Sequence, residues 1–231
     1  MKIIFWSDYA CPYCYIGERR LHKAINKLGL ADQIIFEPKA FELDPDAPAT
    51  VVSDTPSRFA RKYRMPLEQA IAQVEHISQL GRAEGIDFRY ASTQYTSTFN
   101  AHRLMKLALS TNDKDIAAKT NELLFAAYFT ENHKLAEDAT LLKIGHDAGL
   151  DENAVKKMLG SDEFAAAVRE DEREAAARGI HGVPYFIFPD GATVPGAVSE
   201  NDFVQILQRN LSVINSIKAE QCGPNGCAVK F

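Results

Sequence analysis

Two cysteines near the N-terminus have a spacing that supports redox chemistry. The run Cys11-Pro12-Tyr13-Cys14 follows a short apolar segment and opens a helical pattern. A helix N-terminus carries partial positive charge and unpaired N–H groups, so it favours the thiolate of Cys11, and the thiolate is the nucleophile. Cys14 lies three residues further on the same helix face, where it can close a disulfide with Cys11 or resolve a mixed disulfide. The spacing therefore predicts a reactive dithiol.

The other two of the four cysteines, Cys222 and Cys227, form a second close pair at the opposite end of the chain. The Gly-Pro-Asn-Gly sequence between them favours a tight turn that can bring their sulfurs together. A disulfide there would close a very small loop and stabilise the fold little, which favours a second redox pair. Two alternatives stay open: an inert tail, and a zinc site with all four cysteines as ligands.

The composition limits the class of protein. The 231 residues are 46% hydrophobic and 25% charged, which is ordinary for a globular protein. A formal net charge of −5 argues against a nucleic-acid partner. No apolar run reaches the roughly 18 residues of a membrane span, and Met1 leads almost at once into the first predicted strand, which leaves no room for a signal peptide. We therefore expect a cytoplasmic protein without nucleic-acid or membrane partners.

Strand patterns lie near the two ends of the chain, and helical patterns fill the middle. The elements predicted in chain order are strand 2–7, helix 15–28, strand 34–43, a helical segment 56–178, strands 185–188 and 193–196, and a final helix. The helical segment interrupts an α/β unit, so the two halves of that unit must meet across it, as in a domain insertion.

Polar residues before the periodic runs predict where helices begin. The expected N-caps are Asn112, Asp138, Asp151 and Ser161. Before the final helix, Ser199 and Asp202 match a capping box with Asp in place of Glu.

The loop before strand 185–188 holds a further candidate site. Val183-Pro184 follows glycines and heads the strand, so it is a candidate for a cis peptide bond, with a trans proline as the alternative. His181 lies three residues before Pro184, and as an imidazolium it would stabilise a nearby thiolate. The alternative for His181 is a solvated loop histidine.

Together these features resemble the DsbA-like thiol–disulfide oxidoreductases, whose thioredoxin fold is interrupted by a helical insertion. The Cys-Pro-x-Cys helix start, the Gly-Val-Pro loop and the segment 99–104 (Phe-Asn-Ala-His-Arg-Leu) each resemble a feature of that family. The resemblance spans residues 1–215, and the cysteine-bearing tail is most similar to the FrnE-like cytoplasmic branch. Tyr13 stands where the best-known periplasmic enzyme has His, so a strongly oxidising character is not carried over.

The resemblance implies an α/β fold, namely a thioredoxin fold with a large helical insertion domain between the second strand and the C-terminal β-hairpin and helix. The expected thioredoxin-like domain is discontinuous and covers residues 1–50 and 180–217. Residues 51–179 would form the insertion domain, and 218–231 a cysteine-containing tail.

The resemblance also implies roles for single residues. Cys11 would attack, Cys14 would resolve, and Pro184 would face the disulfide while the Val183 backbone pairs with an extended substrate. The remaining candidates are Tyr13 and Trp6 as substrate-binding residues, with core packing as the alternative for Trp6, and His181 as a residue that tunes the dithiol. The expected partners are disulfide- or thiol-containing proteins, with glutathione as a further candidate, and neither a cofactor nor a metal is implied.

Two other functions remain as alternatives. Kappa-class glutathione transferases and 2-hydroxychromene-2-carboxylate isomerases resemble this architecture, but they use a serine near the position of Cys11 and lack the paired cysteines. A non-catalytic zinc- or chaperone-type binding protein is the second alternative. Among redox enzymes, oxidase, reductase and isomerase directions all stay open, and no oligomeric state is predicted.

Overall fold

A four-stranded sheet lies at the centre of the computed structural model, which describes the backbone of residues 1–223 and 226–227 and the side chains of residues 1–212. The sheet has the order β2-β1-β3-β4. The strands are β1 (Lys2–Ser7), β2 (Ile35–Ala40), β3 (Tyr185–Ile187) and β4 (Thr193–Pro195). β2 runs parallel to β1, while β3 is antiparallel to both β1 and β4. The first and last parts of the chain therefore meet between β1 and β3, as predicted.

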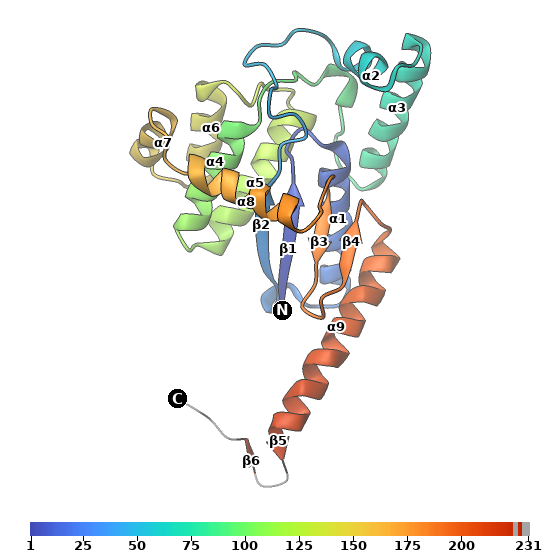
Figure 1. Cartoon of the computed structure of the whole chain (residues 1–231), viewed down its shortest axis with the longest axis vertical. Helices are drawn as coiled ribbons and strands as arrows, with labels where there is room; N and C mark the ends of the chain where they lie inside the picture. Colours follow the sequence, from blue (N-terminus) through green and yellow to red (C-terminus); the bar gives the residue numbers. More distant parts are fainter. Residues whose placement is uncertain (224–225, 228–231) are drawn as a thin grey trace.

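Helices surround this sheet and form most of the rest of the molecule (Figure 1). They are α1 (Pro12–Lys27), α2 (Thr55–Tyr63), α3 (Leu67–Ala83), α4 (Phe99–Ser110), α5 (Lys114–Phe129), α6 (Asp138–Ala148), α7 (Glu152–Leu159), α8 (Ala165–Ala177) and α9 (Glu200–Gln221), with short 3₁₀ turns at Ala31–Gln33 and Tyr90–Ser92. After α9, β5 (Cys222–Gly223) pairs with β6 (Gly226–Cys227). Among the described residues, none of the helices has the length and apolar character that crossing a bilayer requires.

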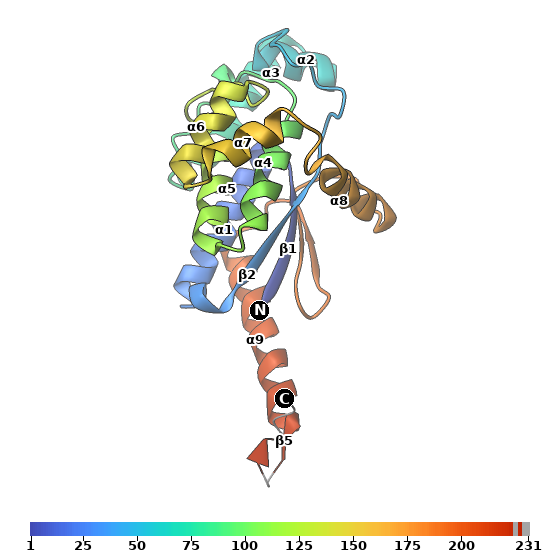
Figure 2. The same cartoon turned by 90° about the vertical axis from the view of Figure 1, so that its left-hand side faces the viewer.

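The sheet is covered on both faces, which explains why β1 is apolar along most of its length. Side chains of a strand alternate between faces. Phe5 lies on the side of α1 and α9, where its ring stacks on Phe186 with 4.6 Å between ring centroids. Trp6 lies on the opposite side and packs with Ala175 and Ile180 near α8. Figure 2 shows α8 across the sheet from α1.

Proline in β2 is tolerated because β2 is an edge strand. Pro38 is paired with Phe5 in the parallel register, and an edge strand needs backbone N–H donors on only one side. Pro38 can therefore lie within β2 without removing a hydrogen bond between two neighbouring strands.

Two of the expected helix starts are confirmed by hydrogen bonds. Asp151 accepts from the Ala154 amide at 2.8 Å at the start of α7. Before α9, the Ser199 amide donates to the Asp202 carboxylate at 3.1 Å, and the Asp202 amide donates to the Ser199 hydroxyl at 3.2 Å. This is the reciprocal capping box that the sequence predicted.

Three of the expected caps were wrong by one to three residues. Asn112 adopts the left-handed conformation with φ 58°, and its neighbour Asp113 caps α5 instead. Asp138 is the first residue inside α6 rather than its cap. Ser161 donates its hydroxyl to the Lys157 carbonyl of the preceding helix, so α8 begins later. In each case a local turn, which sequence periodicity does not register, shifts the boundary.

Candidate functional site

The dithiol lies at the start of α1, directly after β1. Cys11 is the N-cap, with φ −92° and ψ 113°, and Pro12 is the first helical residue, where its missing N–H costs nothing. The Cys11 amide donates to the Asp8 carbonyl at 3.0 Å, and the Cys14 amide donates to the Cys11 carbonyl at 3.1 Å. Both cysteines are free thiols, with 3% and 0% of their surface exposed. Both sulfurs are therefore buried at the helix start, and only Cys11 keeps a small exposed area.

The loop that carries Pro184 faces this dithiol. The Val183–Pro184 peptide bond is cis, which confirms the prediction for this bond. The Cys11 thiol donates to the Val183 carbonyl with 3.6 Å between Sγ and O. The structure therefore brings Cys11 together with Val183 and Pro184, which are distant from it in the sequence and were expected to share a site with it.

A close approach by α1 holds Pro184 in place. Gly17 lies on α1, and a Cβ atom there would be 3.4 Å from Cγ of Pro184 and 3.2 Å from Cβ of Ala197. The Gly196 amide donates to the Pro184 carbonyl at 2.7 Å, and Arg20 donates to the Ala197 carbonyl at 2.9 Å. Glycine at position 17 lets the helix pass this close, because a Cβ would already be in tight contact and a larger side chain would displace the proline loop.

The surroundings of Cys14 hold it as a thiol. Burial raises the pKa of Cys14 well above its ordinary value, and the hydrogen bond and negative charge of Cys11 raise it further. The pKa of Cys14 therefore depends on the state of the Cys11 sulfur, because a Cys11 sulfur without negative charge does not make that contribution.

Asp8 is a buried carboxylate beneath the dithiol that sequence reasoning missed. Its two oxygens accept from the Ala10 amide at 3.1 Å and the Leu43 amide at 2.8 Å. Burial alone would raise the pKa of Asp8, but His102 and the two amides outweigh burial and leave that pKa below its usual value. Its partners are mostly backbone groups, and the only signal in the sequence was an acid placed directly after an apolar strand.

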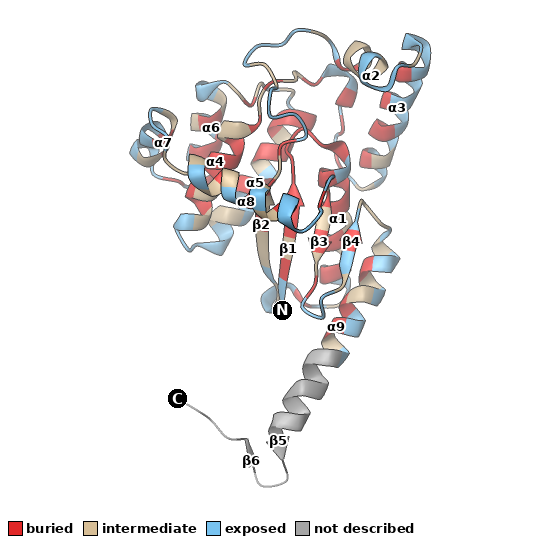
Figure 3. Cartoon of the chain, viewed as in Figure 1, coloured by how far each residue is buried: buried red, intermediate tan, exposed pale blue. Residues whose placement is uncertain are grey.

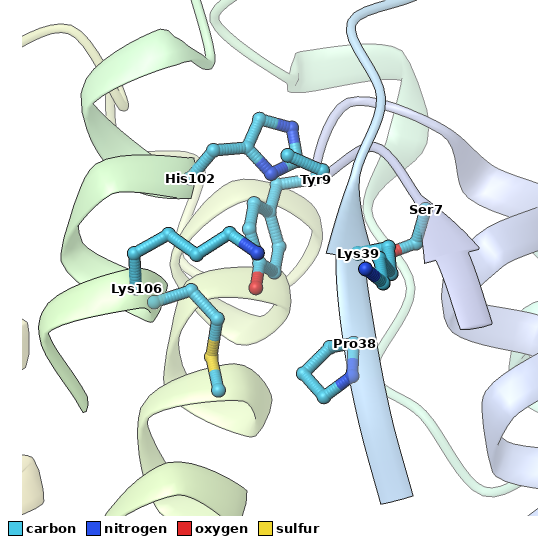
Figure 4. A pocket seen from close by; sticks show the side chains of 8 residues that line it. Ser7, Tyr9, Pro38, Lys39, His102 and Lys106 are labelled. Atoms are coloured by element: carbon cyan, nitrogen blue, oxygen red, sulfur yellow. The ribbon is translucent and has the colours of Figure 1, made fainter. Parts of the chain in front are cut away.

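His102 lies beside Asp8 in the helical part of the molecule. Its Nε2 is 3.8 Å from Oδ1 of Asp8, too far for a hydrogen bond, and this buried nitrogen has no hydrogen-bond partner. The His102 ring lies 5.0 Å from the Tyr9 ring, and both border a cavity of about 10 Å³, the size of one water molecule (Figure 4). His102 is thus a buried structural residue next to the site.

Tyr13 is the exposed member of the Cys-Pro-Tyr-Cys run. It is 42% exposed, and burial of the remainder, together with the charge of Cys11, raises the pKa of its hydroxyl. Tyr63 at the end of α2 is also exposed and adds to this effect. Figure 3 shows α2 and α3 as mostly exposed helices above the buried ends of β1 and α1. Tyr13 is accordingly positioned to contact a molecule that reaches Cys11.

Trp6 and His181, two of the expected site residues, differ in exposure. Trp6 has no exposed surface, and its indole nitrogen donates to the Asp171 carbonyl at 3.0 Å. This burial supports the core-packing alternative for Trp6, because a fully buried ring cannot contact substrate. His181 is exposed on the loop before Pro184.

The second cysteine pair is described only through its backbone. Cys222 and Cys227 are Cα partners in the β5–β6 hairpin, which agrees with the expected turn between them. Their side chains lie outside the described residues, as do both the predicted second redox pair and the four-cysteine zinc alternative.

Comparison with known proteins shows which family and which solved structures this chain resembles. The sequence matches the DSBA-like thioredoxin domain over residues 2–208. The crystal structure of a probable DsbA oxidoreductase from Streptomyces coelicolor is 31% identical, with a TM-score of 0.84 over all of both chains.

Two more distant structures share the fold. The cytosolic disulfide reductase DsbM from Pseudomonas aeruginosa is 17% identical, with a TM-score of 0.61 over 92% of this chain and all of that one, and it has also been solved with GSH. A 2-hydroxychromene-2-carboxylate isomerase is 18% identical, with a TM-score of 0.61 over 95% of this chain and 98% of that one. The profile match and the 31% identity over the full length decide the family: this chain belongs to the DSBA-like thioredoxin domain family.

Proposed function

We propose that this protein is a thiol–disulfide oxidoreductase that uses Cys11 as the attacking thiol and Cys14 as the resolving thiol. The observation that carries this proposal is the placement of Cys11 Sγ at the start of α1, 3.6 Å from the carbonyl of Val183. The helix start favours the thiolate, and the cis Val183–Pro184 segment offers backbone groups beside the sulfur that an extended substrate can pair with.

The reaction proceeds through a mixed disulfide. The Cys11 thiolate attacks one sulfur of a substrate disulfide, so a bond forms between Cys11 and that sulfur while the substrate S–S bond breaks and the other half leaves as a thiolate. Cys14 then gives its proton to solvent and attacks Cys11, which releases the first half as a thiolate. Two electrons pass from the dithiol to the substrate, and the same steps in reverse oxidise a substrate dithiol.

Thiol- or disulfide-containing proteins and glutathione are the proposed substrates. The DsbM structure with GSH supports glutathione as a candidate on this fold. Oxidase, reductase and isomerase activities differ only in the reduction potential of the Cys11–Cys14 pair and in the redox partner. A cytoplasmic location and membership of the FrnE-like branch remain part of this proposal.

The alternative function, a glutathione transferase or 2-hydroxychromene-2-carboxylate isomerase on the same fold, is less well supported by the residues of the site. The 2-hydroxychromene-2-carboxylate isomerase shares the fold, but Cys11 and Cys14 are both present here and lie at one helix start. A transferase or isomerase of that kind needs no resolving thiol, whereas Cys14 has no evident purpose other than resolution or disulfide formation.

A redox equilibrium titration tests the proposal. The protein is equilibrated in glutathione buffers of different composition, and the redox state of Cys11 and Cys14 is read by peptide mass spectrometry after alkylation, which separates them from Cys222 and Cys227. We expect a reversible two-electron transition within about −120 to −300 mV, the range of this class of dithiol, which is lost in Cys11→Ser. Failure of the intact protein to show a transition in that range would reject the proposed function.

A further inference from the structure

A positively charged hollow lies beside α2, outside the residues assigned so far. It is open to solvent and has a volume of about 450 Å³, which is within the range of small-molecule sites. Its lining residues are Leu43, Asp44, Arg58, Arg61, Lys62 and Tyr95. We call this feature the α2 hollow, because its three cations all come from α2. The concentration of positive charge is notable in a protein whose formal net charge is −5.

The three cations of the α2 hollow contact neutral groups. The Arg58 guanidinium lies 3.8 Å from the centroid of the Tyr95 ring, and its buried Nε has no hydrogen-bond partner. Arg61 donates to the Ser53 hydroxyl at 2.8 Å, and Lys62 lies 5.9 Å from the ring centroid of its neighbour Tyr63. Among the described side chains, none of the three forms a direct ion pair with a carboxylate, although Arg61 is close enough to Asp54, the N-cap of α2, for their charges to interact.

The one carboxylate in the hollow is already engaged. The Tyr95 hydroxyl donates to Oδ2 of Asp44 at 2.9 Å. The lining therefore has three positive groups against one negative group, and the donors of Arg58, Arg61 and Lys62 can still take charged acceptors. Arginine and lysine bind carboxylates through charge-assisted hydrogen bonds, which are about twice as strong as neutral ones.

The α2 hollow is joined to the dithiol through Asp8. Leu43, in the wall of the hollow, donates its amide to the Asp8 carboxylate at 2.8 Å. The carbonyl of the same Asp8 accepts from the Cys11 amide at 3.0 Å. Two hydrogen bonds to one residue thus connect the wall of the hollow to the backbone of Cys11, and this short connection is the geometric basis for treating the hollow and the dithiol as parts of one site.

We infer that the α2 hollow binds the carboxylates of low-molecular-weight thiols and disulfides and orients their sulfur toward Cys11. This inference rests on the proposed function, since it names the substrate class of the same site. The disulfide of such a compound takes the two electrons of the Cys11–Cys14 dithiol: the substrate S–S bond breaks, the Cys11–Cys14 bond forms, and two thiols leave. In the reverse direction, its thiol form reduces the Cys11–Cys14 disulfide.

A comparison of two disulfides tests the inference. The reduced protein is oxidised in single turnovers by glutathione disulfide, which carries carboxylates, and by bis(2-hydroxyethyl) disulfide, which is neutral. For the double variant Arg61→Gln/Lys62→Gln we expect the rate with glutathione disulfide to fall by about tenfold or more, the loss of one charge-assisted hydrogen bond. With the neutral disulfide we expect a fall of at most about twofold, and the difference should shrink as salt screens the charges.

Arg64→Gln is the matched control. Arg64 is an exposed cation at the end of the same helix that does not line the hollow. Arg64→Gln removes one positive charge, as each of the two substitutions in the double variant does, but it should leave the preference for glutathione disulfide unchanged. If Arg64→Gln lowers the rate with glutathione disulfide as much as Arg61→Gln or Lys62→Gln alone, the effect is one of general charge and the inference is overturned. Equal losses of rate with both disulfides in the double variant would also overturn it.

A binding measurement separates this inference from the proposed function. S-methylglutathione carries the same carboxylates but cannot exchange disulfides, so calorimetry with it reports on the hollow alone. We expect binding that weakens by about tenfold in the double variant. Redox turnover without such binding would overturn the inference and leave the proposed function standing. Binding without any redox transition would overturn the proposed function, and with it the assignment of the ligand as a substrate.

Discussion

At the level of single residues, the two cysteines differ because Cys11 is the N-cap of α1 and Cys14 lies within its first turn. The Cys11 sulfur meets the helix start and the Val183 carbonyl, whereas Cys14 has no exposed surface. Burial and the proximity of Cys11 raise the pKa of Cys14 well above its ordinary value. The same Cys-x-x-Cys spacing thus places the two thiols in different surroundings, which supports the proposed attacking role of Cys11 and the proposed resolving role of Cys14.

This asymmetry predicts different alkylation of the two thiols. We expect iodoacetamide to label Cys11 first and to leave Cys14 unlabelled up to pH values above about 8.5, the ordinary cysteine pKa, because Cys14 remains a buried thiol. Peptide mass spectrometry after short pulses at several pH values measures this. Labelling of Cys14 that titrates near pH 8.5 would show that burial does not control its ionisation.

Several of these residues could be predicted from the sequence, and others could not. The spacing of Cys11 and Cys14 and the family resemblance pointed to the dithiol and to Pro184. Asp8 was missed because its partners are backbone amides, which every sequence contains. Trp6 was proposed as a substrate contact because its position in a strand does not reveal that α8 covers that face of the sheet.

At the scale of elements, α1 is the part that assembles the site. It begins at the dithiol, passes Pro184 at Gly17, and is tied to the loop after β4 through Arg20. The order and type of the elements followed from apolar periodicity, because each strand and helix has its own repeat. The left-handed residues Asn112 and Phe164 displaced predicted helix starts, since turns of this kind depend on tertiary packing.

A larger side chain at position 17 should disturb the site from within α1. We expect Gly17→Leu to destabilise the protein by about 1–3 kcal/mol through overpacking and to slow the reaction of Cys11 with glutathione disulfide, because Pro184 must move. Gly17→Ala is the control, since its crowding is offset by a gain in helix propensity of up to about 1 kcal/mol. Urea unfolding and single-turnover rates measure both effects, and a Leu variant that matches the Ala variant in both would argue against the close approach.

Glu84 links α1 to the end of α3. Arg20 and Lys23 contact its carboxylate at 2.6 and 2.7 Å. Burial opposes ionisation of Glu84, but Lys23 and Arg20 outweigh it and hold the pKa of Glu84 below its usual value. The stabilisation is therefore fully present above the unfolded pKa of about 4.3 and is lost as the pH falls through the lower folded value.

The corresponding prediction concerns Glu84→Gln. We expect it to lower the free energy of unfolding by about 1 kcal/mol at pH 7. Below about pH 4, the difference in free energy of unfolding between the variant and the parent protein should become smaller as the pH falls. Urea denaturation across this range measures it. A difference that is independent of pH would mean that the carboxylate charge is not what stabilises this contact.

At the scale of the whole molecule, β1 joins parts that are far apart in the sequence. It pairs with β2 on one side and with β3, which follows the helical segment, on the other. The helical segment in turn places α2 and its cations near the dithiol, at the end of the molecule from which α9 points away (Figure 1). The sequence predicted the insertion, but nothing in its periodicity indicated which helix would border the site.

The second cysteine pair lies beyond α9 and is best tested as a pair. We predict that Cys222 and Cys227 exchange electrons with the Cys11–Cys14 dithiol of the same or a neighbouring chain, because a tethered dithiol acts at an effective concentration on the order of millimolar. The double variant Cys222→Ser/Cys227→Ser should then turn over more slowly. Unchanged turnover and an unchanged potential of the Cys11–Cys14 pair would make the tail independent of the active site.

The identity of the attacking sulfur is the central claim, and trapping of a mixed disulfide tests it most directly. Glutathione disulfide is added to reduced Cys14→Ser and to reduced Cys11→Ser, each with Cys222 and Cys227 also changed to Ser, and the adducts are located by peptide mass spectrometry. We expect one stable glutathione on Cys11 in the first variant and little or none on the buried Cys14 in the second. Equal modification of Cys14, or an unmodified Cys11, would contradict it.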